Sequence, residues 1–143
     1  MSLARTVQVI IDQPWAQVCA FLADPARYGA WAGWLGPTLR CRRGAWTVQR
    51  GPVRAKVRFT PRNAWGVADH CVVDAPDRAS FVALRAVPHD AGCVVVATFF
   101  REPGWSDAQW LAYLERAQQS LLRLKALLDE APEAQAQPEL IAA

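Results

Sequence analysis

His70 is a residue whose type and position in the sequence could support chemistry. It falls within a predicted strand, residues 65–73, where Ala68 and Val72 are its neighbours on the same face. A histidine on an apolar strand face can supply a polar group to a pocket or act as a general acid or base. The same pattern fits a structural histidine held by hydrogen bonds, and the sequence leaves both readings open.

Familiar catalytic patterns are absent from the rest of the chain. There is no GxSxG elbow, HExxH pair or glycine-rich phosphate loop, and no helix face carries paired carboxylates. The cysteines form no CxxC pair and do not stand at metal-ligand spacing with a histidine: Cys19, Cys41, Cys71 and Cys93. We therefore expect no metal and no cofactor, and four buried free thiols.

Seven tryptophans are a high number for 143 residues. Trp31 and Trp34 lie where a predicted short helix opens into a loop, and Trp110 lies on the longest predicted helix. Most core tryptophans supply packing area. An aromatic wall with few polar groups is also what an apolar ligand needs, so these three residues are candidates for the mouth of a cavity.

Basic residues form a stripe on the early strands. Arg54, Lys56 and Arg58 alternate with apolar residues along predicted strand 53–60, and arginines also stand at positions 40, 42 and 43. We interpret this stripe as a solvated sheet face, with an anionic partner such as a membrane surface or RNA as the alternative. Because the net charge is only +3, we expect no nucleic acid partner.

The longest helical pattern covers residues 106–130. Ser106 and Gln109 stand in capping-box positions at its start. Apolar residues recur at alternating spacings of four and three, which predicts one buried stripe: Trp110, Leu114, Ala117, Leu121, Leu124 and Leu128.

Upstream of this helix the sequence predicts a strand, two short helices and further strands. The first strand covers residues 5–11, and the short helices cover 14–23 and 25–31. The later strands cover residues 39–50 with an interruption at Gly44, then 53–60, 65–73, 80–87 and 93–101. Alternation places four residues on the concave side: Trp46, Val48, Val57 and Phe59. Both faces of the last strand, which contains Phe99, are apolar, so its orientation stays open.

Length and composition describe one domain. With 52% hydrophobic and 20% charged residues, the chain can bury a core without disulfides or metals. We expect a single domain over residues 1–130 and a disordered tail over 131–143, which has two prolines and little to bury. No membrane span or signal peptide is predicted, so we expect a cytoplasmic protein.

The order of these elements and several motifs resemble the helix-grip fold of the START and birch-pollen-allergen superfamily, also called SRPBCC or polyketide cyclase-like. The opening motifs are VIIDQP at 9–14, VCAFLADP at 18–25 and YGAW at 28–31. GVADH at 66–70, FFREPGWS at 99–106 and LKALL at 124–128 are similar to a bacterial branch. The resemblance covers about residues 5–130. It implies an α+β fold in which a curved antiparallel sheet of about six strands wraps the long C-terminal helix and encloses a cavity.

The resemblance also implies an apolar ligand, such as a lipid, polyketide or sterol, with catalysis in only some members. We therefore hypothesise a protein that binds an apolar or aromatic small molecule between the sheet and the C-terminal helix. One alternative is a cyclase or dehydratase that uses His70 as acid or base. Another is a lipid or quinone chaperone, or a partner-binding module. Whether the chain is an enzyme, and whether it forms a homodimer, stays open. The expected ligand-binding residues are Trp31, Trp34, Trp46, Val48, Val57, Phe59, His70, Val72, Phe99, Trp110 and Leu114.

Overall fold

A seven-stranded antiparallel sheet is the framework of the computed structural model, which describes residues 3–130. Its strand order is β1-β7-β6-β5-β4-β3-β2. The strands are β1 (Ala4–Ile11), β2 (Arg40–Arg42), β3 (Ala45–Arg50), β4 (Val53–Phe59), β5 (His70–Ala75), β6 (Arg78–His89) and β7 (Gly92–Phe100). The predicted tail at 131–143 lies outside the described residues.

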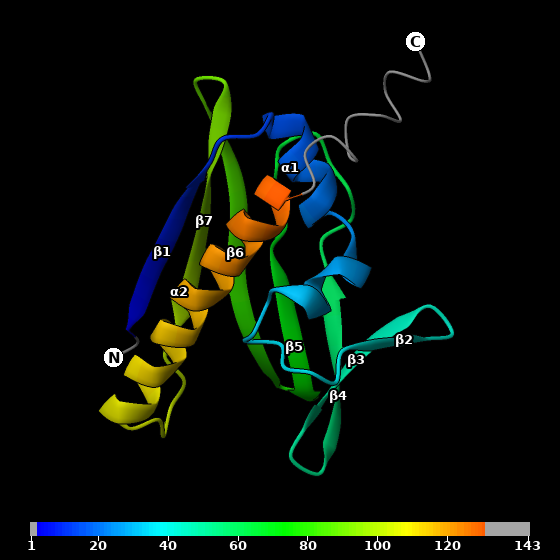
Figure 1. Ribbon diagram of the computed structural model, residues 1–143. Helices are drawn as coiled ribbons and strands as arrows, with labels where there is room; N and C mark the ends of the chain where they lie inside the picture. Colours follow the sequence, from blue (N-terminus) through cyan, green and yellow to red (C-terminus); the bar gives the residue numbers. More distant parts are fainter. Residues whose placement is uncertain (1–2, 131–143) are drawn as a thin grey trace.

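Three helical segments lie on one face of this sheet (Figure 1). They are α1 (Trp15–Leu22), the 3₁₀-helix η1 (Pro25–Ala30) and the long α2 (Asp107–Glu130). We call the face that they cover the inner face and the opposite one the outer face. The predicted α+β architecture is confirmed: a curved antiparallel sheet holds a long C-terminal helix, and two short helical segments separate β1 from β2.

The sheet has one strand more than expected because residues 39–50 form a hairpin. Arg42 pairs with Ala45, and Arg43 and Gly44 between them have φ values of 52° and 79°. Two successive positive φ angles are typical of a tight turn between antiparallel strands, and glycine adopts such angles without strain. The interpretation of Gly44 as an interruption within one strand is therefore wrong.

The predicted strand at 65–73 begins five residues later than expected, at His70. In the preceding segment, one isolated β-bridge between Val67 and Arg85 takes the place of a continuous ladder. Trp65 is 77% exposed in this segment. The sequence pattern suggested a strand because apolar residues alternate there, but the Asn63 side chain instead holds a loop: its Oδ1 accepts from the amides of Trp65 and Val67.

The capping box at the start of α2 is confirmed. The amide of Gln109 donates to Ser106 Oγ at 3.1 Å, and the amide of Ser106 donates to Gln109 Oε1 at 2.8 Å. The apolar stripe of α2 faces the sheet as predicted, although Leu114 is only half-buried. At the C-terminal end of α2, Lys125 Nζ donates to the carbonyl oxygen of Ile10 on β1.

The short helical segments are joined by a buried phenol. Asp24 caps η1 through Oδ1, which accepts from the amide of Ala26 at 3.1 Å, and Pro25 occupies the first helical position. Tyr28 on η1 donates its hydroxyl to the carbonyl oxygen of Leu22 on α1 at 2.7 Å. These contacts fix the direction in which the chain leaves η1.

The segment that follows, which we call the inner loop (residues 31–36), lies between α2 and the sheet. The amide of Gly33 donates to Ser120 Oγ on α2 at 2.9 Å. On the other side, Arg50 of β3 donates to the carbonyl oxygens of Leu35 and Trp34 at 3.0 and 2.9 Å. The inner loop is thus hydrogen-bonded to α2 on one side and to β3 on the other.

Strand alternation correctly assigned most inner-face residues. Val48, Val57, His70 and Val72 are buried there, and Phe99 of β7 settles the orientation that the sequence left open. The cysteines are free thiols, but only Cys93 is buried; Cys41 is exposed, because a cysteine on the projecting β2 has little to pack against. No helix among residues 3–130 is long and apolar enough to cross a membrane.

Candidate functional site

His70 lies in the middle of an aromatic cluster on the inner face. Its Nε2 accepts a hydrogen bond from the indole Nε1 of Trp34 at 2.9 Å, and its Nδ1 lies 3.0 Å from the carbonyl oxygen of Ala68. An indole N–H can only donate and a carbonyl oxygen can only accept. The ring is therefore the neutral tautomer with its proton on Nδ1.

Burial lowers the pKa of His70 from its ordinary value of 6.5 to about 4, because the charged form would lose its solvation. The Ala68 carbonyl and the Asp69 charge oppose this effect only partly. The side chain is 2% exposed and both nitrogens already have partners. The geometry therefore gives no support to His70 as an acid or base toward a substrate.

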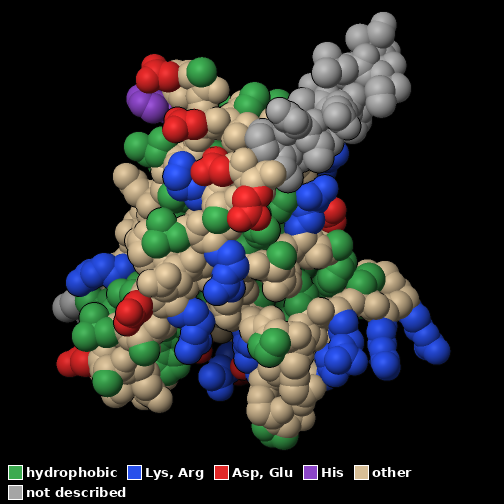
Figure 2. All heavy atoms as spheres, viewed as in Figure 1, with side chains coloured by type: hydrophobic (Ala, Val, Ile, Leu, Met, Phe, Trp, Pro, Cys, Tyr) green, Lys and Arg blue, Asp and Glu red, His purple; other side chains and the backbone are tan. Residues whose placement is uncertain are grey.

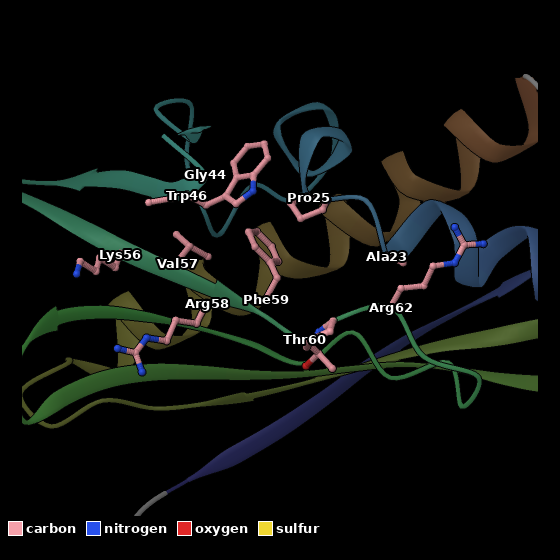
Figure 3. Close-up of a pocket in the computed structure, with 12 residues that line it drawn as sticks. Ala23, Pro25, Gly44, Trp46, Lys56, Val57, Arg58, Phe59, Thr60 and Arg62 are labelled. Atoms are coloured by element: carbon pink, nitrogen blue, oxygen red, sulfur yellow. The ribbon is translucent and has the colours of Figure 1, made fainter. Parts of the chain in front are cut away.

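A pocket of about 650 Å³ opens nearby, between the start of η1 and the β3–β4 part of the sheet (Figure 3). It is bounded by the end of α1, the β2–β3 turn, β4 and the segment that follows β4. Its lining residues are Ala23, Pro25, Gly44, Ala45, Trp46, Lys56, Val57, Arg58, Phe59, Thr60, Pro61 and Arg62. The volume lies within the range of about 300–1,000 Å³ that is usual for small-molecule sites.

The inner wall of this pocket is apolar and aromatic. Trp46 and Phe59 meet edge to face, with ring centroids 6.1 Å apart. In Figure 3, Trp46, Val57 and Phe59 project to the side of β3 and β4 on which Pro25 lies, whereas Lys56 and Arg58 extend away from them. A planar apolar molecule could stack against these rings.

Phe59 separates the pocket from the buried cluster around His70. Its ring centroid lies 4.9 Å from that of Tyr28 and 5.6 Å from that of His70. The pocket therefore shares one wall with the core but does not reach the imidazole. Among residues 3–130, no group of three or more His, Cys, Asp or Glu side chains is placed to hold a metal ion.

Solved structures resemble this architecture over nearly the whole chain. An aromatase/cyclase from a Streptomyces species matches with a TM-score of 0.65 and 17% identity, covering 92% of this chain and 96% of that one. The chain has the helix-grip fold. Ara h 8.0201 matches with a TM-score of 0.58 and 7% identity, over 91% and 99% of the two chains. Norcoclaurine synthase from Thalictrum flavum matches with a TM-score of 0.52 and 12% identity, over 85% and 94%. No protein-family model and no curated sequence matches.

In this helix-grip protein, three of the eleven expected ligand-binding residues line the pocket: Trp46, Val57 and Phe59. Trp31 and Trp34 do not line this pocket: the inner loop carries them into the core, where they are 0% and 4% exposed. Val48, Val72 and Phe99 are buried on the inner face. On α2, Trp110 stacks on Tyr113 and Leu114 packs beside the core.

Sequence reasoning missed the pocket residues outside the strands. Pro25 and Ala23 come from the junction of the two short helices, and Gly44 from the β2–β3 turn. One sequence feature could have indicated part of this wall: the two residues Arg43 and Gly44 separate two strand-like segments, as in a tight hairpin turn. Local sequence could not show that this tip lies beside η1.

Proposed function

We propose that the protein binds an apolar or aromatic small molecule in the pocket lined by Trp46, Val57 and Phe59. The observation that carries this proposal is a pocket of about 650 Å³ whose inner wall is made of an indole, a phenyl ring and an aliphatic side chain. Burial of an apolar molecule contributes roughly 25 cal/mol per Å² of surface removed from water. A ligand of a few fused or linked rings has the right size and chemistry.

The fold supports binding in general but selects no ligand, because one fold hosts many functions. Two of the structural neighbours are enzymes by name, an aromatase/cyclase and norcoclaurine synthase. In this chain the buried His70 has both nitrogens occupied and does not line the pocket. We therefore propose a ligand-binding protein and assign no catalytic step.

Binding of a neutral apolar dye such as phenylnaphthylamine tests the proposal by fluorescence titration. We expect saturable binding that Trp46→Ala weakens about tenfold, since loss of a ring contact costs about 1 kcal/mol beyond the lost area. Trp65→Ala is the matched control, because Trp65 is 77% exposed and lies outside the pocket. Equal affinities for the Trp46 and Trp65 variants would place the dye elsewhere and reject this pocket.

Native mass spectrometry of protein purified from its own host would then identify the ligand. A bound mass that is retained by the Trp65 variant and lost from the Trp46 variant supports this site. A bound mass retained equally by both variants contradicts it.

A further inference from the structure

The outer face of the sheet, which no helix of the described residues 3–130 covers, carries a cluster of cations on β2 and β4 (Figure 1). Five exposed side chains point to this face: Arg40, Arg42, Arg54, Lys56 and Arg58. Thr47 pairs with both Arg40 and Lys56, so the two cations lie on neighbouring strands of the same surface. Among residues 3–130 none of the five forms an ion pair, and of their side chains only that of Arg54 makes a hydrogen bond, to Thr47 Oγ1 at 3.4 Å.

This cluster belongs to a larger segregation of charge along the chain. Residues 25–68 contain nine of the sixteen basic residues and none of the thirteen acidic ones. Lys and Arg side chains gather at the projecting β2–β3 end of the molecule (Figure 2). Asp69 is already paired with Arg85 of β6 at 3.0 Å. A directed positive field therefore remains although the net charge is only +3.

The other half of the outer face, which we call the apolar half, presents large exposed apolar side chains beside Arg85 and a few neutral polar residues. Four large side chains on β1, β6 and β7 are 43–55% exposed there: Ile10, Phe81, Val87 and Phe100. The rings of Phe81 and Phe100 lie 6.4 Å apart. The pairings of Cys71 with both Arg58 and Phe81 join the cationic and apolar halves in one row across the sheet. Clustered exposed apolar side chains usually mark an interaction site.

We propose that this outer face docks on a membrane surface that contains anionic phospholipids. The cations would meet the phosphate groups, and the apolar half would enter the boundary of the acyl layer. The observations favour this partner over two others. A second copy stacked on the same face would oppose like charges, and a nucleic acid could not stack bases on Ile10 or Val87. The ligand pocket opens on the inner side; Lys56 and Arg58 belong to its lining as well, but their side chains extend away from its aromatic wall (Figure 3).

Vesicle flotation tests this docking. The probes are vesicles of phosphatidylcholine alone and of phosphatidylcholine mixed with phosphatidylglycerol, each at low and high salt. The full chain should bind the mixed vesicles and not the neutral ones, and binding should weaken as salt screens the charges. The triple variant Arg54→Gln, Lys56→Gln, Arg58→Gln should bind on the order of 100-fold more weakly. The matched control is Arg5→Gln, Arg116→Gln, Arg123→Gln, which removes the same charge from exposed positions elsewhere and should bind like wild type.

A second variant tests the apolar half. Ile10→Ser with Phe100→Ser should weaken binding at both salt concentrations, because burial of apolar area is not screened. Several outcomes would overturn the proposal: no binding of wild type to the mixed vesicles, equal losses in the two triple variants, or an unchanged affinity in the serine variant. Displacement of the protein from vesicles by a short RNA at equal phosphate concentration would show that nucleic acid is the preferred partner instead. Circular dichroism of every variant confirms that these surface changes leave the fold intact.

Discussion

The indole N–H of Trp34 donates to Nε2 of His70 across 2.9 Å, and this bond joins the inner loop to the centre of the sheet. The two rings are nearly parallel, at 11°. Because His70 is also bound to the Ala68 carbonyl, the pair has no polar atom left for a ligand. The residue that looked most like a catalytic group therefore organises the core.

Protonation of His70 should destabilise the fold in acid. Its pKa is about 4 in the folded state and near 6.5 when unfolded, so the unfolded chain binds the proton more tightly between these values. The contribution is fully present above pH 6.5 and is lost as the pH falls toward 4, amounting to about 3 kcal/mol. Thermal melts between pH 7 and pH 4 measure it.

A His70→Gln variant should show a flatter dependence of melting temperature on pH over this range, whereas His89→Gln, at the exposed end of β6, should keep the wild-type slope. A His70→Gln variant with the full wild-type slope would assign the acid sensitivity to other groups.

Trp34→Phe should leave Nε2 of His70 without its donor. A buried acceptor without a partner costs about 1–3 kcal/mol, in addition to the packing lost by the smaller ring. The neutral imidazole also loses the bond that favours it, so the pKa of His70 should rise from about 4. Denaturant unfolding measures the stability, and NMR titration of the imidazole measures the pKa. An unchanged pKa would mean that the Trp34 bond contributes little.

Gly33 and Ser120 should show coupled effects on stability. A Cβ on Gly33 would lie 2.9 Å from Ser120 Oγ and 3.3 Å from Arg116 Cγ. Gly33→Ala must therefore move the inner loop and α2 apart. Ser120→Ala removes the acceptor of the Gly33 amide and should cost about 1–3 kcal/mol. In the double variant the added methyl meets no hydroxyl, so the combined cost should fall below the sum of the two. Additive costs in a double-mutant cycle would contradict this contact.

Loss of the α2 cap, which lies outside the core, should lower the free energy of unfolding. Ser106→Ala removes the oxygen that accepts from the Gln109 amide and should cost about 1 kcal/mol of folding free energy. Gln109→Ala removes the reciprocal bond and should cost less, because alanine has a higher helix propensity than glutamine and offsets part of the loss. Asp107→Ala serves as a comparison at the same end of α2. Any loss of stability in that variant comes from the ion pair of Asp107 with Arg101, at 2.8 Å, and not from the cap. A Ser106 variant as stable as wild type would show that water replaces the cap without loss.

The sequence by itself determined the order of most elements and the buried faces of the most regular ones. Strict alternation along β4 separated Val57 and Phe59 from Lys56 and Arg58, because a strand turns successive side chains to opposite faces. The helical spacing of Ala117, Leu121, Leu124 and Leu128 likewise predicted the buried stripe of α2. These patterns are local, so they can be read without knowing which elements meet.

Only the tertiary structure decided where the inner loop and the pocket lie between the sheet and the helices. Whether Trp34 lined a cavity or closed it depended on Ser120 and Arg50, two anchors that lie 87 and 15–16 positions away from the inner-loop groups they bind. The same is true of the pocket, whose walls come from η1, the β2–β3 turn and β4. Such contacts are set by how distant segments pack in space, and no spacing along the chain encodes them.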